Sequence, residues 1–211
     1  MEILIIWIIA LVALAVSLSL YRKRLNKQRE EFILAYEFPQ RVKNKLKSTY
    51  PHLDDPQVQQ VIHALKEYFI ICNIAKKRMV SMPSQAVDVV WHEFILFTRI
   101  YEDFCKQGFG KYLHHTPAEA MKTPTLAQDG IKRTWRLSCI RESINIKSPE
   151  RLPILFTIDA ELAIPDGFRY TLDCSRSPDG SSFCASSIGC GGGCGGGGDG
   201  DGGGGCGGGG D

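Results

Sequence analysis

The stretch DPQVQQVIHALKEYFIICNIAKK, residues 55–77, is the clearest helix signal in the chain and sets the expected fold class. Asp55 is a residue type that caps helix N-termini, and Pro56 follows where a missing N–H costs nothing. One apolar stripe then recurs at helical spacing: Val58, Ile62, Leu65, Phe69 and Cys72. The pattern predicts a helix with one buried face, and therefore a domain built by packing helices.

Similar start signals predict further helices downstream. The segment PSQAVDVVWHEFILFTRIYEDFC, residues 83–105, is expected to form one helix capped by Ser84. TPAE, residues 116–119, matches a capping box. TLAQ, residues 125–128, opens a helix expected to run through Trp135. These segments predict a mainly α-helical domain.

The sequence pattern changes after Pro149. Residues 155–158 and 168–172 are β-prone, and they flank the turn signal PDG at residues 165–167. A short β-hairpin or an extended segment is expected to lie against the helices. The expected fold class is therefore mainly α, with an N-terminal transmembrane helix, a small helical bundle, this short β element and a disordered Gly/Cys tail.

An apolar segment opens the chain. Residues 3–20 are apolar except for Ser17 and Ser19, and a helix of that length spans about 27 Å, close to the thickness of a bilayer core. A cleaved secretory signal would need a basic leading region and a small-residue cleavage site, whereas only Met1 and Glu2 precede this segment. The sequence therefore predicts an uncleaved transmembrane anchor.

A cluster of cations follows the apolar segment: Arg22, Lys23, Arg24, Lys27 and Arg29. Because an excess of Lys and Arg marks the cytoplasmic side of a span, the N-terminus is expected outside and the C-terminal domain in the cytoplasm, at a cell (inner) membrane. Residues 3–29 are expected to contact membrane lipids, with the cations pairing with anionic headgroups.

Composition indicates an ordinary soluble domain beyond the anchor. Hydrophobic residues make up 44% and charged residues 23% of the chain, and the net charge of +2 gives no support to a nucleic-acid partner. The expected parts are a transmembrane anchor (1–21), a basic juxtamembrane segment (22–30), a helical globular domain (31–173) and a Gly/Cys/Asp-rich tail (174–211). The tail is expected to be disordered, because residues 189–211 offer no apolar side chain to bury and their glycines would lose much backbone entropy on ordering.

The segment VDVVWHEFIL, residues 87–96, carries the most distinctive side chains. Helical spacing places Trp91 on the apolar face, as a core aromatic whose indole N–H needs one partner. It places His92 on the polar face, one turn beyond Asp88, where an exposed i,i+4 contact is the simplest interpretation and an oriented, functional imidazole is the alternative. Glu93 falls at the edge of the apolar arc, where a carboxylate needs a buried partner.

The partner of Glu93 is expected from the cations Lys132, Arg133 and Arg136. A structural ion pair or hydrogen-bonded carboxylate is favoured over a general base at this position.

Candidate metal ligands follow in the same region: Asp88, His92, Cys105, His114 and His115. Zinc or another transition metal would suit these side chains, although their spacing lacks the paired helical histidines of H-E-x-x-H. The alternative is that His114 and His115 only close a loop. Cys105 is not expected to act as a nucleophile, because a helix C-terminus disfavours the thiolate. No other cofactor is expected.

The remaining cysteines divide into two groups. Cys72 and Cys139 are expected to be small buried core residues. The others crowd the C-terminal end: Cys174, Cys184, Cys190, Cys194 and Cys206. In a cytoplasmic tail these thiols are expected to be free, and capture of a soft metal by them is an alternative function.

The segment AVDVVWHEFILFTRIYEDFCKQGFGKYLHHTP, residues 86–117, resembles the glycine-rich domain-containing protein-like family, as a membrane-anchored, bacterial member. The residues that match its V-D-x-x-W-H core and the tyrosine, cysteine and histidine that follow are Asp88, Trp91, His92, Tyr101, Cys105 and His114. The family often has a second histidine two places after the first, and here that residue is Phe94. The resemblance covers residues 50–120 and implies a helical domain with a recurrent W-H helix, but no established reaction.

These patterns together predict a single-pass, membrane-anchored cytoplasmic interaction or scaffolding protein whose protein partner is unknown. The alternatives are a metal-binding protein or a membrane-associated enzyme that uses the Asp88 and His92 helix, assisted by Glu93 or His114, and metal handling by the Cys-rich tail. The enzyme interpretation comes second because the sequence offers no convergent acid, base and nucleophile.

Overall fold

The computed structural model describes residues 2–115, 124–172 and 183–184, and these contain seven helices and two short strands. The helices are α1 (Glu2–Ala35), α2 (Gln40–Thr49), α3 (Asp55–Ala75), α4 (Gln85–Ile95), α5 (Thr98–Phe109), α6 (Pro124–Arg141) and α7 (Ile154–Glu161). The strands are β1 (Tyr170–Thr171) and β2 (Phe183–Cys184). The fold is mainly α, as the sequence predicts.

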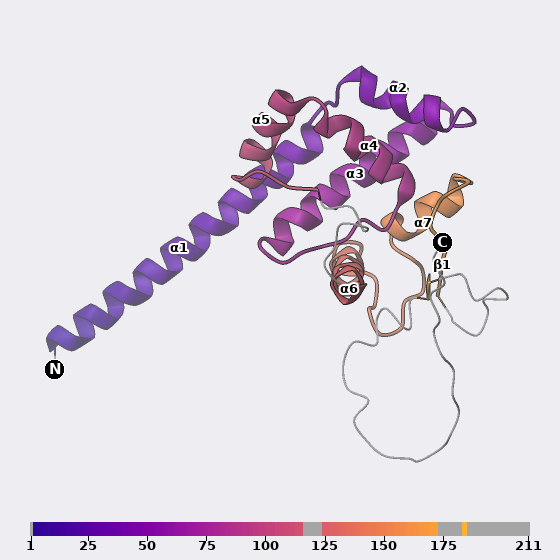
Figure 1. Cartoon of the computed structure of the whole chain (residues 1–211). Coiled ribbons are helices and arrows are strands. Elements are labelled where there is room, and N and C mark those ends of the chain that lie inside the picture. The colour runs from indigo at the N-terminus through magenta and orange to yellow at the C-terminus, as the bar shows by residue number, and fades with distance from the viewer. Residues whose placement is uncertain (1, 116–123, 173–182, 185–211) are drawn as a thin grey trace, which may run out of the picture.

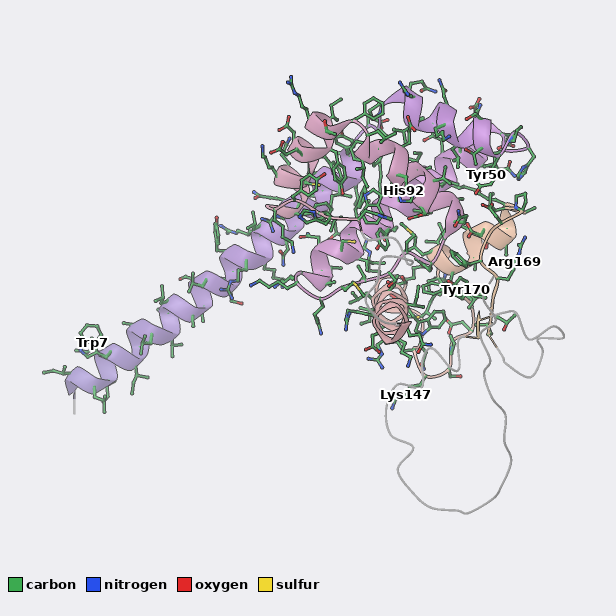
Figure 2. The ribbon with its side chains drawn as sticks, in the orientation of Figure 1. Trp7, Tyr50, His92, Lys147, Arg169 and Tyr170 are labelled. Carbon is green, nitrogen blue, oxygen red and sulfur yellow. The ribbon has the colours of Figure 1, made fainter. Side chains whose placement is uncertain are left out.

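Helix α1 projects from the helical domain as one long rod (Figure 1). Its segment Ile3–Ala35 is long and apolar enough to cross a membrane by length and composition, and its apolar window is entirely exposed. Trp7 lies far out on this projecting part, whereas His92 lies in the domain at the other end (Figure 2). The last turns of α1 enter the core, because Ile33 is fully buried there. The rod and the domain are therefore joined without a break in the helix.

Helix α3 forms the centre of the domain and contacts α1, α2, α4, α6 and α7. The predicted apolar stripe is buried along its whole length. The predicted cap is wrong by one residue, since Asp54 is the N-cap. The Asp54 side chain accepts from the backbone N–H of Gln57, and the Gln57 side chain accepts from the backbone N–H of Asp54. Asp54 wins over Asp55 because a glutamine stands three residues after it and completes this capping box.

The helix predicted over residues 83–105 is broken into α4 and α5. The break falls at Phe97, whose ψ of 60° leaves the helical region. In one straight helix Trp91 and Tyr101 would be about 15 Å apart along the axis. In the structure the Trp91 indole Nε1 lies 3.1 Å from the Tyr101 hydroxyl, a contact that only the bend allows.

Arg141 fastens α1 to the domain. Its guanidinium binds both carboxylate oxygens of Glu67 on α3, with Nε–Oε2 and Nη2–Oε1 distances of 2.7 and 3.1 Å. A third bond of 2.9 Å reaches Glu30 on α1. Because a planar guanidinium fixes the direction of each bond, this cluster contributes, with the packing of α1 on α3 and α5, to the angle at which α1 leaves the domain.

The β-strand prediction is right for one segment and wrong for the other. Residues 155–158 lie in α7, where Leu155, Phe156 and Ile158 are buried. A short apolar run does not distinguish a buried strand from a buried helix, which explains the error. The predicted extended segment at 168–172 contains β1, which pairs in parallel with β2 and so forms no hairpin.

Two further predictions concern residues that the structure leaves largely undescribed. The capping box predicted at residues 116–119 lies outside the described residues. The tail predicted to be disordered also lies outside the described residues, apart from Phe183–Cys184. Those two residues form β2.

Candidate metal site

The first turn of α4 is held by a buried carboxylate from α7. The Asp159 side chain is 3% exposed and accepts from the Ser84 hydroxyl at 2.7 Å, and from the backbone N–H groups of Gln85 at 2.7 Å and Ala86 at 3.2 Å. Ser84 is the N-cap, as predicted, and accepts from the backbone N–H of Val87. These bonds satisfy N–H groups that a helix start leaves without partners, and they fix the position of the residues one turn further along α4.

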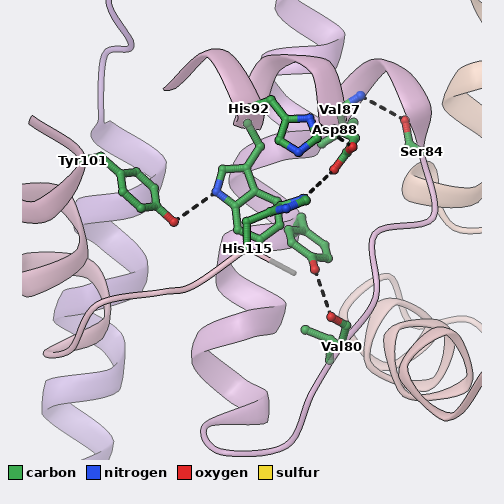
Figure 3. A network of polar contacts seen from close by, with 9 residues as sticks. Val80, Ser84, Val87, Asp88, His92, Tyr101 and His115 are labelled. Carbon is green, nitrogen blue, oxygen red and sulfur yellow. Dashed lines mark hydrogen bonds and ion pairs between the residues drawn. The ribbon is translucent and has the colours of Figure 1, made fainter. Parts of the chain in front are cut away.

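Asp88, His92 and His115 converge beside this anchored turn (Figure 3). Oδ1 of Asp88 lies 2.9 Å from Nε2 of His115, and Oδ2 lies 3.4 Å from Nδ1 of His92. The two imidazole rings lie 4.3 Å apart, centroid to centroid. One ligand atom from each of the three residues falls within 4.8 Å of the others. The predicted i,i+4 contact of Asp88 with His92 is confirmed, and His115 joins it from a distant part of the chain.

Trp91 and Tyr101 bring His115 to this place. The His115 ring meets the Trp91 indole edge-on at a centroid distance of 4.2 Å. Tyr101 accepts from the Trp91 indole N–H and donates to the backbone carbonyl of Leu113 at 2.6 Å. Burial raises the pKa of Tyr101 above its ordinary value, so the hydroxyl keeps its proton and remains a donor. The predicted core role of Trp91, with one partner for its N–H, is confirmed.

Replacing Tyr101 by Phe is expected to lower the free energy of unfolding by about 2 kcal/mol, because the Trp91 N–H and the Leu113 carbonyl both lose a buried partner. The freed loop should also hold His115 less firmly and weaken any ligand bound there. Chemical denaturation measures the first effect. Tyr112→Phe, which removes the same hydroxyl from a tyrosine that is 41% exposed, is the control and should leave stability nearly unchanged. If Tyr101→Phe unfolds at the wild-type denaturant concentration, the Tyr101 hydroxyl does not hold the loop.

Two of the predicted ligands lie outside the cluster. Cys105 is fully buried, and burial raises the pKa of its thiol, so it supplies no thiolate at neutral pH. His114 packs its ring against Tyr112 at a centroid distance of 4.8 Å and is exposed. Cys72 and Cys139 are buried, as predicted. The structure thus brings together three of the candidate ligands.

The predicted partner of Glu93 is wrong. The side chain of Glu93 is 8% exposed and binds Nε of Arg41 at 3.0 Å, so its cation comes from α2 and not from α6. Helix α2 packs directly on α4, whereas Arg133 on α6 donates to the backbone carbonyl of Met79. The expectation of a structural ion pair is met, and Glu93 lies in it rather than in the histidine cluster.

The donor set fits a divalent transition metal. Imidazole nitrogens and a carboxylate are standard ligands for zinc, and at metal–ligand distances near 2.0–2.1 Å neighbouring donors in a tetrahedral site lie about 3.3 Å apart. The contacts of 2.9 and 3.4 Å are made by different oxygens of Asp88, Oδ1 with His115 and Oδ2 with His92. A ligand set with one atom from each residue spans up to 4.8 Å and needs a small side-chain rotation to close on a metal ion. The His92 side chain is 48% exposed and therefore free to make it.

Comparison with known proteins identifies one relationship. A model of the UCP032817-like family matches residues 28–189, which is most of the helical domain and part of the tail. The predicted resemblance to the glycine-rich domain-containing protein-like family is therefore wrong. That resemblance rested on the residues in and after one W-H helix, with one histidine missing, and this pattern is not specific enough to separate families. No curated protein and no solved structure matches the chain.

Proposed function

The chain belongs to the UCP032817-like family, and we propose that it is a single-pass membrane protein whose helical domain binds a divalent transition metal, zinc above others. The ligands are Asp88, His92 and His115. The observation that supports this proposal is the convergence of their donor atoms within 4.8 Å of one another, although His115 is far from the other two in sequence. Zinc suits two imidazoles and one carboxylate, and three protein ligands leave a position for water or a small anion.

The membrane part of the proposal places the domain in the cytoplasm, at the inner membrane, with the N-terminus outside. It is supported by the long exposed apolar part of α1 and by the cations that follow it, Arg22, Lys23, Arg24, Lys27 and Arg29. Positively charged flanks favour the cytoplasmic side. A metal site in this domain would then meet the metal pool of the cytoplasm.

The structural surroundings also support a ligand role over a purely packing role for the histidines. Asp88 is shared by both imidazoles, and its side chain is only 22% exposed. A metal ligand needs support from groups that fix its direction, and here Trp91 fixes the His115 ring while the capped first turn fixes Asp88. The partly exposed His92 is the ligand that completes the site when metal arrives.

A zinc titration of the full-length protein in detergent tests the proposal. The wild type should bind one equivalent of zinc that is absent in His92→Ala, as measured by calorimetry and by elemental mass spectrometry after dialysis. His63→Ala is the matched control, because His63 is an exposed helical histidine on α3 outside the cluster, and it should keep that equivalent. Binding should weaken in acid, because protonated imidazole is no ligand.

Other results would redirect the proposal. Zinc that persists in His92→Ala at full stoichiometry would place the metal elsewhere, with the tail thiols as the first alternative. No bound zinc in any variant would remove metal binding and leave the interaction or scaffolding function, with its protein partner unknown, as the working hypothesis. In that case the Asp88 cluster serves to hold the chain segment that carries His115.

A further inference from the structure

Helix α5 runs back along α1 toward the membrane end of the rod. Phe104 packs on Tyr36 at a ring distance of 4.7 Å. One turn later, Gly108 faces Ile33. The helix then ends at Gly110, in the left-handed conformation and directly against the Arg29 guanidinium. The chain is thus led down α1, and the residue after Gly110 emerges at the level of Arg29.

That next residue, Lys111, joins the end of α5 to the end of α3. Its Nζ donates to the backbone carbonyl of Lys76 at 2.8 Å. Lys76 caps α3, and Lys77 and Arg78 follow it with exposed side chains. In Figure 1 the ends of α3 and α5 lie together on the side of the domain that faces the projecting part of α1.

Three separate chain segments therefore place cations on one edge of the domain. This basic edge consists of Arg29, Lys76, Lys77, Arg78 and Lys111. The acids closest in sequence to Arg29 are already paired, Glu30 with Arg141 and Glu31 with Lys27. Lys106 is left out of the edge because it pairs with Glu102 and Asp103 on its own helix. The edge keeps a net positive charge.

The edge lies within electrostatic reach of a bilayer. Helix α1 rises about 13 Å between Leu20, the last apolar residue of the predicted span, and Arg29. The headgroup layer takes up about 5–8 Å of that height, and the Debye length at physiological salt is about 8 Å. Extended Lys and Arg side chains cover the rest of the gap.

We propose that the basic edge docks on the anionic lipid headgroups of the membrane that α1 crosses, and so fixes the orientation of the domain on the bilayer. The inference rests on the membrane anchorage in the proposed function and is independent of the metal site. Clustered cations beside a span attract anionic lipids, and each cation near the surface contributes to the attraction. The juxtamembrane segment and this edge together form one lipid-binding surface. The residues that follow α3 and α5 belong to it although they are distant from the juxtamembrane segment in sequence.

Hydrogen–deuterium exchange on the full-length protein tests this docking. The protein is reconstituted in phosphatidylcholine nanodiscs, with or without phosphatidylserine, and the exchange of residues 76–80 and 110–113 is compared. Slower exchange with phosphatidylserine is expected. Lys77→Gln with Arg78→Gln should lower the docking equilibrium constant about 25-fold, since each cation near an anionic surface contributes about a factor of five. Lys45→Gln with Arg99→Gln, two exposed cations on α2 and at the far end of α5, is the matched control and should keep the slow exchange.

The outcomes separate docking from anchorage. Flotation with vesicles of phosphatidylcholine alone reports the anchor and should be the same in all variants. Normal flotation with no effect of phosphatidylserine on exchange would overturn the docking inference and leave the anchor intact. Loss of flotation would overturn the anchor itself. An equal loss of protection in the control pair would show that charge in general, and not the basic edge, is responsible.

Discussion

Asp159→Ala is expected to lower the free energy of unfolding by about 3–5 kcal/mol, the largest effect of any single substitution considered for this protein. The carboxylate is buried and accepts from Ser84, from the backbone N–H groups of Gln85 and Ala86, and from the Phe168 N–H at 3.0 Å. Its removal leaves several donors without partners. The hydrogen bonds that link α7 to the start of α4 and to the segment before β1 are then lost. Urea denaturation followed by circular dichroism measures the change.

Glu161→Ala is the control for Asp159, because it removes an exposed carboxylate from the same helix and should change stability by less than about 0.5 kcal/mol. A second readout follows from the position of α4. If Asp159 sets its first turn, Asp159→Asn should also bind zinc more weakly than the wild type under conditions in which both proteins are folded. If Asp159→Ala has the same free energy of unfolding as the wild type, the Asp159 carboxylate does not hold the start of α4.

Asp88→Asn is expected to weaken zinc binding by about 100-fold or more while the domain stays folded. The amide keeps the shape of the side chain and can still accept from an imidazole, but it removes the only anionic ligand of the proposed site. Changing a group that merely supports a ligand typically costs 10–100-fold in affinity, so the loss of a ligand should reach at least the upper end of that range. Calorimetric titration measures the affinity.

Thermal unfolding provides a second measure of the Asp88 effect. Zinc at 100 times its dissociation constant should stabilise the wild type by about 2.7 kcal/mol, a rise of roughly 5–10 °C in Tm for a chain of this size. The same zinc concentration should leave the Tm of Asp88→Asn nearly unchanged. Asp103→Asn, an exposed carboxylate on α5, should respond to zinc like the wild type. Equal zinc stabilisation of Asp88→Asn and wild type would exclude Asp88 as a ligand.

The sequence predicted what depends on local pattern. The buried stripe of α3, the Ser84 cap, the start of α6 and the contact of Asp88 with His92 all follow from spacings of a few residues, and each is found. The register of the α3 cap was missed because two aspartates stand side by side. Only the position of Gln57 relative to each of them decides which one caps the helix.

What the sequence could not predict depends on contacts between distant segments. The break at Phe97 has no glycine or proline to signal it, and the contact of Trp91 with Tyr101 across the bend stabilises it. Likewise, Glu93 finds its cation on α2 because α2 packs on α4, which no spacing in the sequence reveals. His115 was a candidate ligand by residue type, but its place beside Asp88 depends on the path of the chain after α5.

X-ray absorption at the zinc edge, on the full-length protein loaded with one equivalent of zinc, shows whether Asp88, His92 and His115 hold the metal. We expect a first shell of nitrogen and oxygen only, near 2.0–2.1 Å, with the outer-shell scattering of two imidazoles. A shell of sulfur ligands near 2.3 Å would contradict the proposed site, because this cluster contains no cysteine. Such a result would assign the metal to the cysteines of the tail.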